Sequence, residues 1–363
     1  MQKKIIALAV AGLVSGAAFA QSNVTLYGIV DMGYNYSWDN VTSHTKSKSE
    51  MKAGGLDGSR VGVKGVEDLG NGLKAEFDAT WNFESDRNAP LSLGEGSSVA
   101  LSGNFGKVRA GYFGNFLDDN TGVDASGRHG QIHTGSLYDS GKYENFLAYY
   151  SPNFNGLQFK AGWSSNVGEQ DKTPYQGVEH DDDGNITVDN INTRAYTAAV
   201  SYENGPIKAG IAYAKYVAQD VSNGLKTSDG QDWNAGVSYD FGVARLSLFG
   251  GQQKNGSNIG SLPNFGYVMT KEDADKKNFW ALGASAPIGA NGLIKAGYGQ
   301  SKVKFDNGGD DLKGKAWDIV YLHSLSKRTT AYAMYGNLSG SDDGYLADYT
   351  YQQFFNVGVR HTF

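Results

Sequence analysis

The stretch LKAEFDATWN at residues 73–82 decides the fold of this chain. Its apolar residues alternate with polar ones, which is the pattern of a β-strand with one apolar and one polar face. The same period of two recurs at residues 24–32, 157–164 and 355–363, and so runs through the whole chain. These runs are ~9–12 residues long, which suits a tilted strand crossing a bilayer, whereas strands of soluble sheets are usually ~5–6 residues long.

Two kinds of connection separate the alternating runs. Short clusters of Gly, Asn, Asp and Pro, such as those at 69–72, 152–156 and 240–242, are typical of tight hairpins. Longer polar stretches, including 37–56 and 114–142, lie between them, and the runs number about sixteen.

The charged face of these strands decides between the two possible β architectures. A soluble sandwich would have to bury charge in strand after strand, which is costly. A closed barrel in a bilayer turns its apolar face to lipid, keeps its lumen polar and leaves no strand edge unpaired. We therefore predict an all-β fold, a transmembrane antiparallel up-and-down β-barrel of about sixteen strands.

The composition excludes several other classes of protein. The chain has no cysteine, so disulfide scaffolds and thiolate metal sites are ruled out. Its formal net charge of -6 argues against nucleic acid as a partner, because phosphate binding needs a basic surface. No apolar run reaches the ~18 residues of a membrane-spanning helix.

The N-terminus predicts export. Lys3 and Lys4 precede an apolar stretch at residues 5–14, and an A-x-A cleavage signal ends at Ala20. This is the pattern of a secretory signal peptide over residues 1–20. The mature chain, residues 21–363, is then a single barrel domain.

Four segments in combination carry a family resemblance: VTLYGIVD at 24–31, SRVGVKGVEDLGNGLKA at 59–75, YYSPNFNG at 149–156 and VGVRHTF at 357–363. The mature chain resembles the Gram-negative general porins of the neisserial and betaproteobacterial type. The resemblance implies sixteen strands with short periplasmic turns and long extracellular loops. It also implies that the third long loop, 114–142, folds into the lumen as the constriction.

The resemblance further implies the setting of the protein. A porin of this type is a homotrimer in the outer membrane of a Gram-negative bacterium, in contact with outer-membrane lipid or lipopolysaccharide. Its C-terminal phenylalanine, here Phe363, is the signal that the outer-membrane assembly machinery reads.

We expect a water-filled channel for passive diffusion of ions and small hydrophilic solutes, with no cofactor and no enzymatic reaction. A barrel of about sixteen strands is wide enough for such a channel. The inward phase of the strands predicts a basic wall made of Arg60, Lys64, Lys74, Arg109, Lys160 and, at the start of the sixth strand, Lys142. The constriction loop offers the acids Asp118, Asp119 and Asp124. Opposed charges of this kind would set selectivity and orient dipolar solutes.

The resemblance supports these residues unequally. Arg60 occupies the arginine of the family motif S-R-x-G-x-K-G, and Lys142 stands where the family usually has arginine. The fourth strand begins LGEGSS at 93–98, without the arginine that the family often places there. The ion preference therefore stays open.

Two alternative functions and one alternative site remain. A substrate-selective channel would need an aromatic slide or a dense arginine ladder in the lumen. A barrel enzyme would need a fixed catalytic group, and no G-x-S-x-G or phosphate-loop motif occurs. The segment EHDDD at 179–183 could attract Ca²⁺ or Mg²⁺, although such charge runs are usually solvated loop surface.

Overall fold

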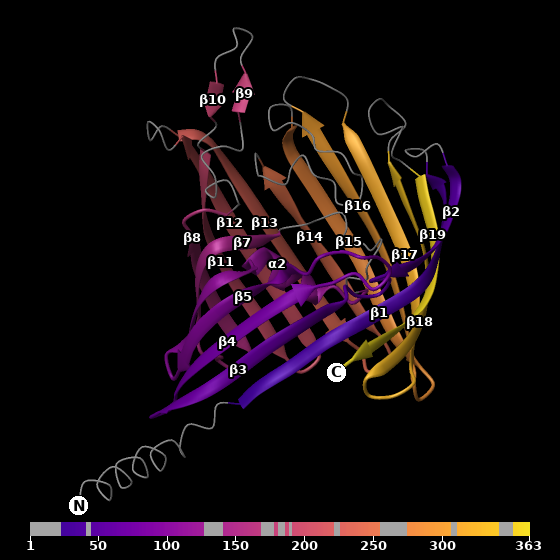
Figure 1. The fold of residues 1–363 in the computed structure, drawn as a ribbon, viewed down its shortest axis with the longest axis horizontal. Coiled ribbons are helices and arrows are strands. Elements are labelled where there is room, and N and C mark those ends of the chain that lie inside the picture. The colour runs from indigo at the N-terminus through magenta and orange to yellow at the C-terminus, as the bar shows by residue number, and fades with distance from the viewer. Residues whose placement is uncertain are drawn as a thin grey trace, which may run out of the picture.

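The computed structural model describes residues 23–40, 45–126, 141–167, 178–180, 186–188, 191–220, 226–254, 274–305, 311–340 and 351–363 (Figure 1). The predicted signal peptide, residues 1–20, lies outside these ranges. No helix within the described ranges is long and apolar enough to span a membrane.

Nearly all of the described residues are in strands. In chain order these are β1 (Asn23–Asn40), β2 (Thr45–Ala53), β3 (Arg60–Gly70), β4 (Leu73–Asn82), β5 (Ser92–Gly103), β6 (Gly106–Gly114), β7 (Lys142–Tyr150), β8 (Leu157–Ser164), β9 (Val178–His180), β10 (Ile186–Val188), β11 (Ile191–Asn204), β12 (Ile207–Asp220), β13 (Lys226–Asp240), β14 (Arg245–Lys254), β15 (Ala274–Ile288), β16 (Gly292–Phe305), β17 (Leu312–Ser324), β18 (Thr329–Gly340) and β19 (Tyr351–Thr362). Between β6 and β7 lie the helix α2 (Phe116–Asn120) and the 3₁₀ turn η3 (Thr121–Val123).

Apart from β9 and β10, which pair with each other in a separate small sheet, the described strands form one closed antiparallel barrel (Figure 1). β2 and β3 both pair with β1 and occupy one position beside it, so the 17 strands of this sheet form a wall of 16 positions. Pairing of β1 with β19 closes the wall. At the seam, Gly28 and Phe363 exchange two backbone hydrogen bonds, each 3.1 Å long. The predicted sixteen-stranded barrel is therefore confirmed.

The two faces of the wall follow the predicted alternation. On β4 the side chain of Phe77 is 41% exposed on the outside, whereas Thr80 is 4% exposed on the lumen side. Val99 and Trp163 are likewise exposed on the outer face, and Asn356 is buried on the inner one. At these positions apolar side chains face away from the barrel axis, as the alternation predicted.

The hairpin signals also mark real turns. Asn71, between β3 and β4, has a φ of 53°, and Asn155, before β8, has a φ of 52°. Both lie in the left-handed region, which asparagine and glycine tolerate best. These short turns gather at one end of the barrel, and the strand ends that flank the longer connections lie at the other (Figure 1).

One predicted loop is wrong in part. The polar stretch 37–56 contains the end of β1 and all of β2, which pair with each other from Met32↔Ala53 to Asn40↔Thr45. β2 has polar residues on both faces, TKSKSEMKA, so the apolar period that identified the other strands is absent from it. Backbone pairing with β1 forms the strand instead.

Candidate channel constriction

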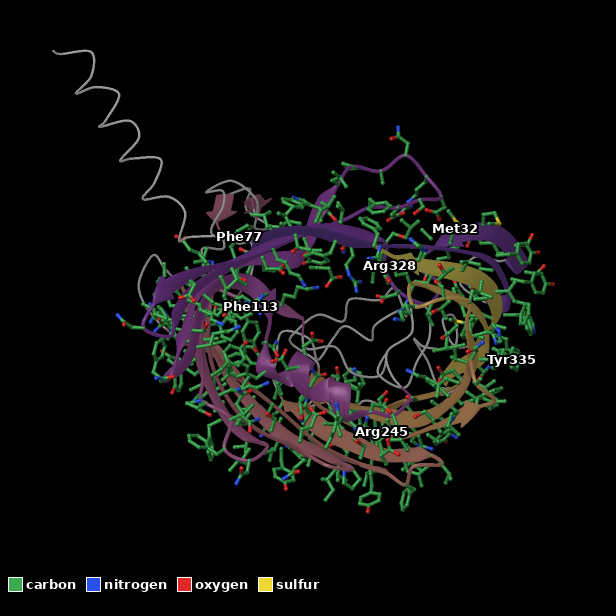
Figure 2. The ribbon with its side chains drawn as sticks, turned by 90° about the horizontal axis from the view of Figure 1, so that it is seen from below. Met32, Phe77, Phe113, Arg245, Arg328 and Tyr335 are labelled. Carbon is green, nitrogen blue, oxygen red and sulfur yellow. The ribbon has the colours of Figure 1, made fainter. Side chains whose placement is uncertain are left out.

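The chain enters the lumen directly after β6 (Figure 2). Asn115 is fully buried and caps α2, since its side-chain oxygen accepts hydrogen bonds from the backbone N–H groups of Leu117 (2.8 Å) and Asp118 (3.1 Å). This is the usual role of asparagine at a helix N-terminus. The cap sets the direction in which the short helix leaves the wall.

An apolar cluster holds α2 inside the barrel. Phe116 and Leu117 are both 0% exposed and belong to one hydrophobic cluster with residues of β7, β11, β12, β14 and β15. The ring of Phe116 lies 5.7 Å from that of Phe146 and 5.4 Å from that of Tyr150, measured between centroids. The loop therefore packs against a wall rather than standing free in the channel.

Hydrogen bonds fix the loop to β13 and β14. Asn120 donates from Nδ2 to Oδ1 of Asn234 (2.8 Å), and Asn234 donates from Nδ2 to the carbonyl oxygen of Leu117 (2.9 Å). Further along, the backbone N–H of Ala125 donates to Oγ of Ser247 (2.7 Å). The anchored segment thus runs across the inside of several neighbouring strands.

On its other side α2 meets the basic wall. The ammonium of Lys160 on β8 lies 3.1 Å from the carboxylate of Asp119. The side chain of Lys160 is only 13% exposed, and its ammonium also lies over the rings of Phe116 and Tyr150. The structure therefore brings Lys160 and Asp119, which the sequence analysis named separately, into direct contact.

Arg109 and Lys64 have no such partner: neither lies within ion-pair distance of any described carboxylate. Arg109 donates from Nε to Oγ of Ser98 (2.9 Å), and its guanidinium lies 3.9 Å from the centre of the Phe113 ring. The ammonium of Lys64 lies 4.9 Å from the centre of the Tyr27 ring. Both cations face the lumen without a direct ion pair, and the nearest strand neighbour of Lys64 with a negative charge is Asp78, directly opposite it on β4.

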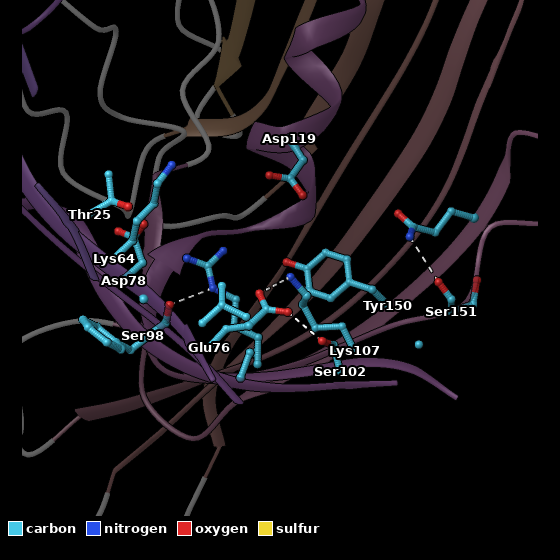
Figure 3. Close-up of a pocket in the computed structure, with 17 residues that line it drawn as sticks. Thr25, Lys64, Glu76, Asp78, Ser98, Ser102, Lys107, Asp119, Tyr150 and Ser151 are labelled. Atoms are coloured by element: carbon cyan, nitrogen blue, oxygen red, sulfur yellow. Dashed lines mark hydrogen bonds and ion pairs between the residues drawn. The ribbon is translucent and has the colours of Figure 1, made fainter. Parts of the chain in front are cut away.

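A polar cavity of about 790 Å³ lies beside these two cations (Figure 3). Its lining includes Lys64, Arg109 and Asp119, together with Glu76 and Lys107, which form an ion pair 2.6 Å long. Strands β3, β4 and β6, together with α2, thus present both signs of charge to the same cavity.

Arg60 belongs to a different cluster, formed where the wall turns inward between β2 and β3. Its guanidinium lies 2.9 Å from the carboxylate of Asp57, which also pairs with Arg360 of β19 at 3.4 Å. The turn is held by Asp31, which is 0% exposed and accepts hydrogen bonds from the backbone of Asp57 (2.7 Å) and from the hydroxyl of Tyr332 (2.7 Å).

The remaining predicted residues lie apart from this centre. Lys142 pairs with Glu95 at 3.6 Å. Lys74 is exposed at the short-turn end of β4. Asp118 is half-buried on α2, and Asp124 turns towards the wall, where it accepts a hydrogen bond from Ser247 (3.1 Å). Asp119 pairs with Lys160 of the basic wall.

Sequence reasoning missed four charged residues of these clusters. Lys107 and Glu76 lie on the inward phase of β6 and β4, so strict use of the period would have found them. Asp57 lies in a turn without periodicity, and Arg360 approaches it only because the barrel closes. No local sequence signal points to that contact.

The acidic segment 179–183 lies only partly within the described residues, with Glu179 and His180 on β9. In the part of the chain that the structure describes, no group of three or more acidic or histidine side chains is arranged to hold a metal ion.

Comparison with known proteins shows which family the chain resembles in sequence and structure. Residues 7–343 match the Gram-negative porin family. The chain is 34% identical to outer membrane porin protein 32 of Delftia acidovorans and 28% identical to the major outer membrane protein P.IB of Neisseria gonorrhoeae, with all of each chain covered. An anion-selective porin from Comamonas acidovorans has a similar structure, with a TM-score of 0.72 at 28% identity, covering 94% of this chain and 100% of that one.

A more distant structure agrees on the fold. The trimer form of OmpT from Vibrio cholerae superimposes with a TM-score of 0.64 at 14% identity, covering 94% of this chain and 99% of that one. The barrel, its inward-folded segment and the full-length match to outer-membrane porins agree, and the chain belongs to the Gram-negative porin family.

Proposed function

We propose that this porin lets ions and small hydrophilic solutes diffuse passively across the outer membrane, with a weak preference for anions set beside α2. The observation that carries the proposal is that Arg109 and Lys64 line the cavity without a direct ion pair to a described acid. Pore-lining charges act at close range, so two such cations favour anions. Asp78 and Asp119 line the same cavity and keep the preference weak.

Other cations of the lumen contribute less to this preference. Arg60 shares Asp57 with Arg360, Lys107 is paired with Glu76, and each pair reduces the net field. In the cavity, Asp78 and Asp119 lie among the cations and not on a separate, opposite wall. We therefore expect dipolar solutes to be oriented locally, near Asp119. Substrate-selective transport is the second candidate, and the cavity lined with both signs of charge favours small zwitterions as its substrates.

We propose a homotrimer as the functional form, in contact with outer-membrane lipid. The trimeric Vibrio cholerae structure of the same fold supports this assembly. We also propose that Phe363, whose backbone pairs with Gly28 at the closing seam, is the signal that the assembly machinery reads. No enzymatic reaction is proposed, since passive diffusion requires none.

Planar-bilayer recording in a KCl gradient tests the proposal. Arg109→Ser should move the reversal potential towards cation preference. Arg60→Ser should move it less, because Asp57 would still be paired with Arg360. Lys215→Ser is the matched control, since Lys215 is exposed on the outer face of β12 between the buried Ala214 and Tyr216.

Three outcomes would contradict parts of the proposal. A wild-type protein that conducts no current would contradict the channel itself. An unchanged reversal potential in Arg109→Ser would contradict its role in selectivity. Conductance steps that never occur in threes would contradict the trimer.

A further inference from the structure

The outer face of the barrel carries a row of lysines at its long-loop end. Lys254 of β14 lies directly opposite Lys276 of β15, and Lys276 lies directly opposite Lys304 of β16. Residues paired in this way share one face of a sheet. Their strand neighbours Lys277 and Val303 are 0% and 1% exposed on the lumen side. The outer lysine row, Lys254, Lys276 and Lys304, therefore points away from the lumen.

The row lies just beyond a group of aromatic side chains on the same face. Trp280 is four residues from Lys276, and its ring lies 5.6 Å from that of Tyr298, which is paired in register with Trp317. Exposed tryptophan and tyrosine mark the level of the lipid headgroups. Four residues of a tilted strand rise about 10 Å. The row thus lies at the outer part of the headgroup layer, on the long-loop side.

None of the three lysines of this row lies within ion-pair distance of a described acid. Like charges directly opposite one another destabilise a sheet. The nearby outward acid, Asp311, is already paired with Lys302 at 2.5 Å. The hydrogen bond from Lys302, with the charges of Lys304 and Lys313, holds the pKa of Asp311 below its usual value. The electrostatic potential is therefore positive even beside the carboxylate of Asp311.

We propose that the outer lysine row binds the phosphate groups of lipid A, the lipid anchor of lipopolysaccharide in the outer leaflet. A phosphate can lie between ammonium groups whose Cβ atoms are about 5 Å apart, and it relieves their mutual repulsion. The acyl chains would then lie along the apolar wall below, beside Trp280 and Leu282, which are 38% and 48% exposed. The inference rests on the proposed placement of this porin in outer-membrane lipid.

The test compares matched double variants of the full mature protein in detergent. Lys276→Gln/Lys304→Gln removes two charges from the row. Lys327→Gln/Arg328→Gln removes two from the turn between β17 and β18 at the opposite end of the barrel. Native mass spectrometry measures binding of bis-phosphorylated lipid A, of dephosphorylated lipid A and of inorganic phosphate to each protein.

We expect the row variant to bind bis-phosphorylated lipid A at least ten-fold more weakly, since each lysine near an anionic leaflet contributes roughly a five-fold factor. The control variant should bind it as the wild type does. Without lipid, the row variant should unfold at a higher temperature than the wild type, because the repulsion is gone. Added lipid A should raise the unfolding temperature of the wild type more than that of the row variant.

Equal affinity of the wild type and the row variant for bis-phosphorylated lipid A would overturn the proposal. Equal binding of dephosphorylated lipid A would overturn the role of phosphate, and binding of inorganic phosphate alone as tightly as lipid A would overturn the lipid as occupant. Bilayer conductance separates this inference from the proposed function. The row faces outward, so the variant should conduct like the wild type even if lipid binding is lost.

Discussion

Replacement of Asn234 by alanine should release α2 from the barrel wall. The side chain of Asn234 is 0% exposed and makes two hydrogen bonds with the loop, one to the Leu117 carbonyl (2.9 Å) and one from the Asn120 amide (2.8 Å). The variant leaves both groups buried without these partners. Each such group costs about 1–3 kcal/mol.

The free-energy cost of leaving both groups without these partners lies in the lower part of the range obtained by adding the two individual costs. Asn120 keeps a long 3.5 Å contact with the main-chain oxygen at position 234, which alanine does not remove. We therefore expect a loss of about 2–4 kcal/mol in the free energy of docking the loop, or roughly 30- to 1,000-fold in the ratio of docked to undocked states. The barrel hydrogen bonds of β13 are main-chain bonds and stay intact.

Amide hydrogen exchange measured by mass spectrometry checks this expectation. Peptides covering Phe116–Asn120 should exchange at least about 30-fold faster in Asn234→Ala, whereas β12 and β13 peptides should be unchanged. Asn204→Ala is the matched control, because it removes a 3.3 Å hydrogen bond to Asn155 at an exposed turn. Unchanged exchange in α2, or equal acceleration throughout the barrel, would refute the view that Asn234 anchors the loop locally.

Three further variants test single contacts of the barrel. Gly96→Ala should destabilise the folded barrel by about 1–3 kcal/mol or more, because the φ of Gly96 is +122° and a Cβ would lie 2.4 Å from the Tyr112 carbonyl oxygen. A variant whose heat-modifiable mobility on a gel matches that of the wild type would contradict this. Tyr332→Phe should lower the free energy of unfolding by about 1–3 kcal/mol, since it removes the 2.7 Å hydrogen bond to buried Asp31, and an unchanged melting temperature would show that the backbone donors suffice. Phe363→Ala should refold in detergent but insert slowly in cells if the residue is mainly an assembly signal, whereas equal insertion rates would leave it a purely structural residue of the seam.

The fold could be predicted from the sequence because the bilayer imposes a simple rule. Lipid demands an apolar outer face and the lumen demands a polar inner one, so the period of two in β4 is visible without any tertiary information. The rule fails for β2, where both faces meet water or other polar groups and the apolar phase vanishes. The period of two therefore does not identify strands whose outer face is not in contact with lipid.

The site could be predicted only in part for the same reason. The inward phase of the strands is sufficient to place Lys160, Arg109 and Lys64 on the lumen side. It could not place Asp119 against Lys160, because that contact depends on how the loop crosses the lumen. Nor could it show that Arg60 shares Asp57 with Arg360, because the two arginines are far apart in the sequence and meet only when the barrel closes.

Exceptions to the inward-polar rule nevertheless carry information about the loop. β12 is apolar on both faces, with Ile211 and Tyr213 outward and Ala212, Ala214 and Tyr216 buried on the lumen side. In a water-filled lumen such inward residues would be exposed, at a cost of about 25 cal/mol per Å² of apolar surface. Something must therefore cover them, and α2 does.

The rest of the docking surface breaks the alternation in the same way. Phe249 of β14 and Phe279 of β15 are also inward and apolar, and they belong to the same cluster as Leu117. By contrast, the inward positions of β3 to β6 carry Lys64, Arg109 and their neighbours, which need water. The position of the loop, and with it the side of the lumen left open to solutes, can thus be inferred from which strands break the alternation. The strands that keep it mark the wall past which solutes move.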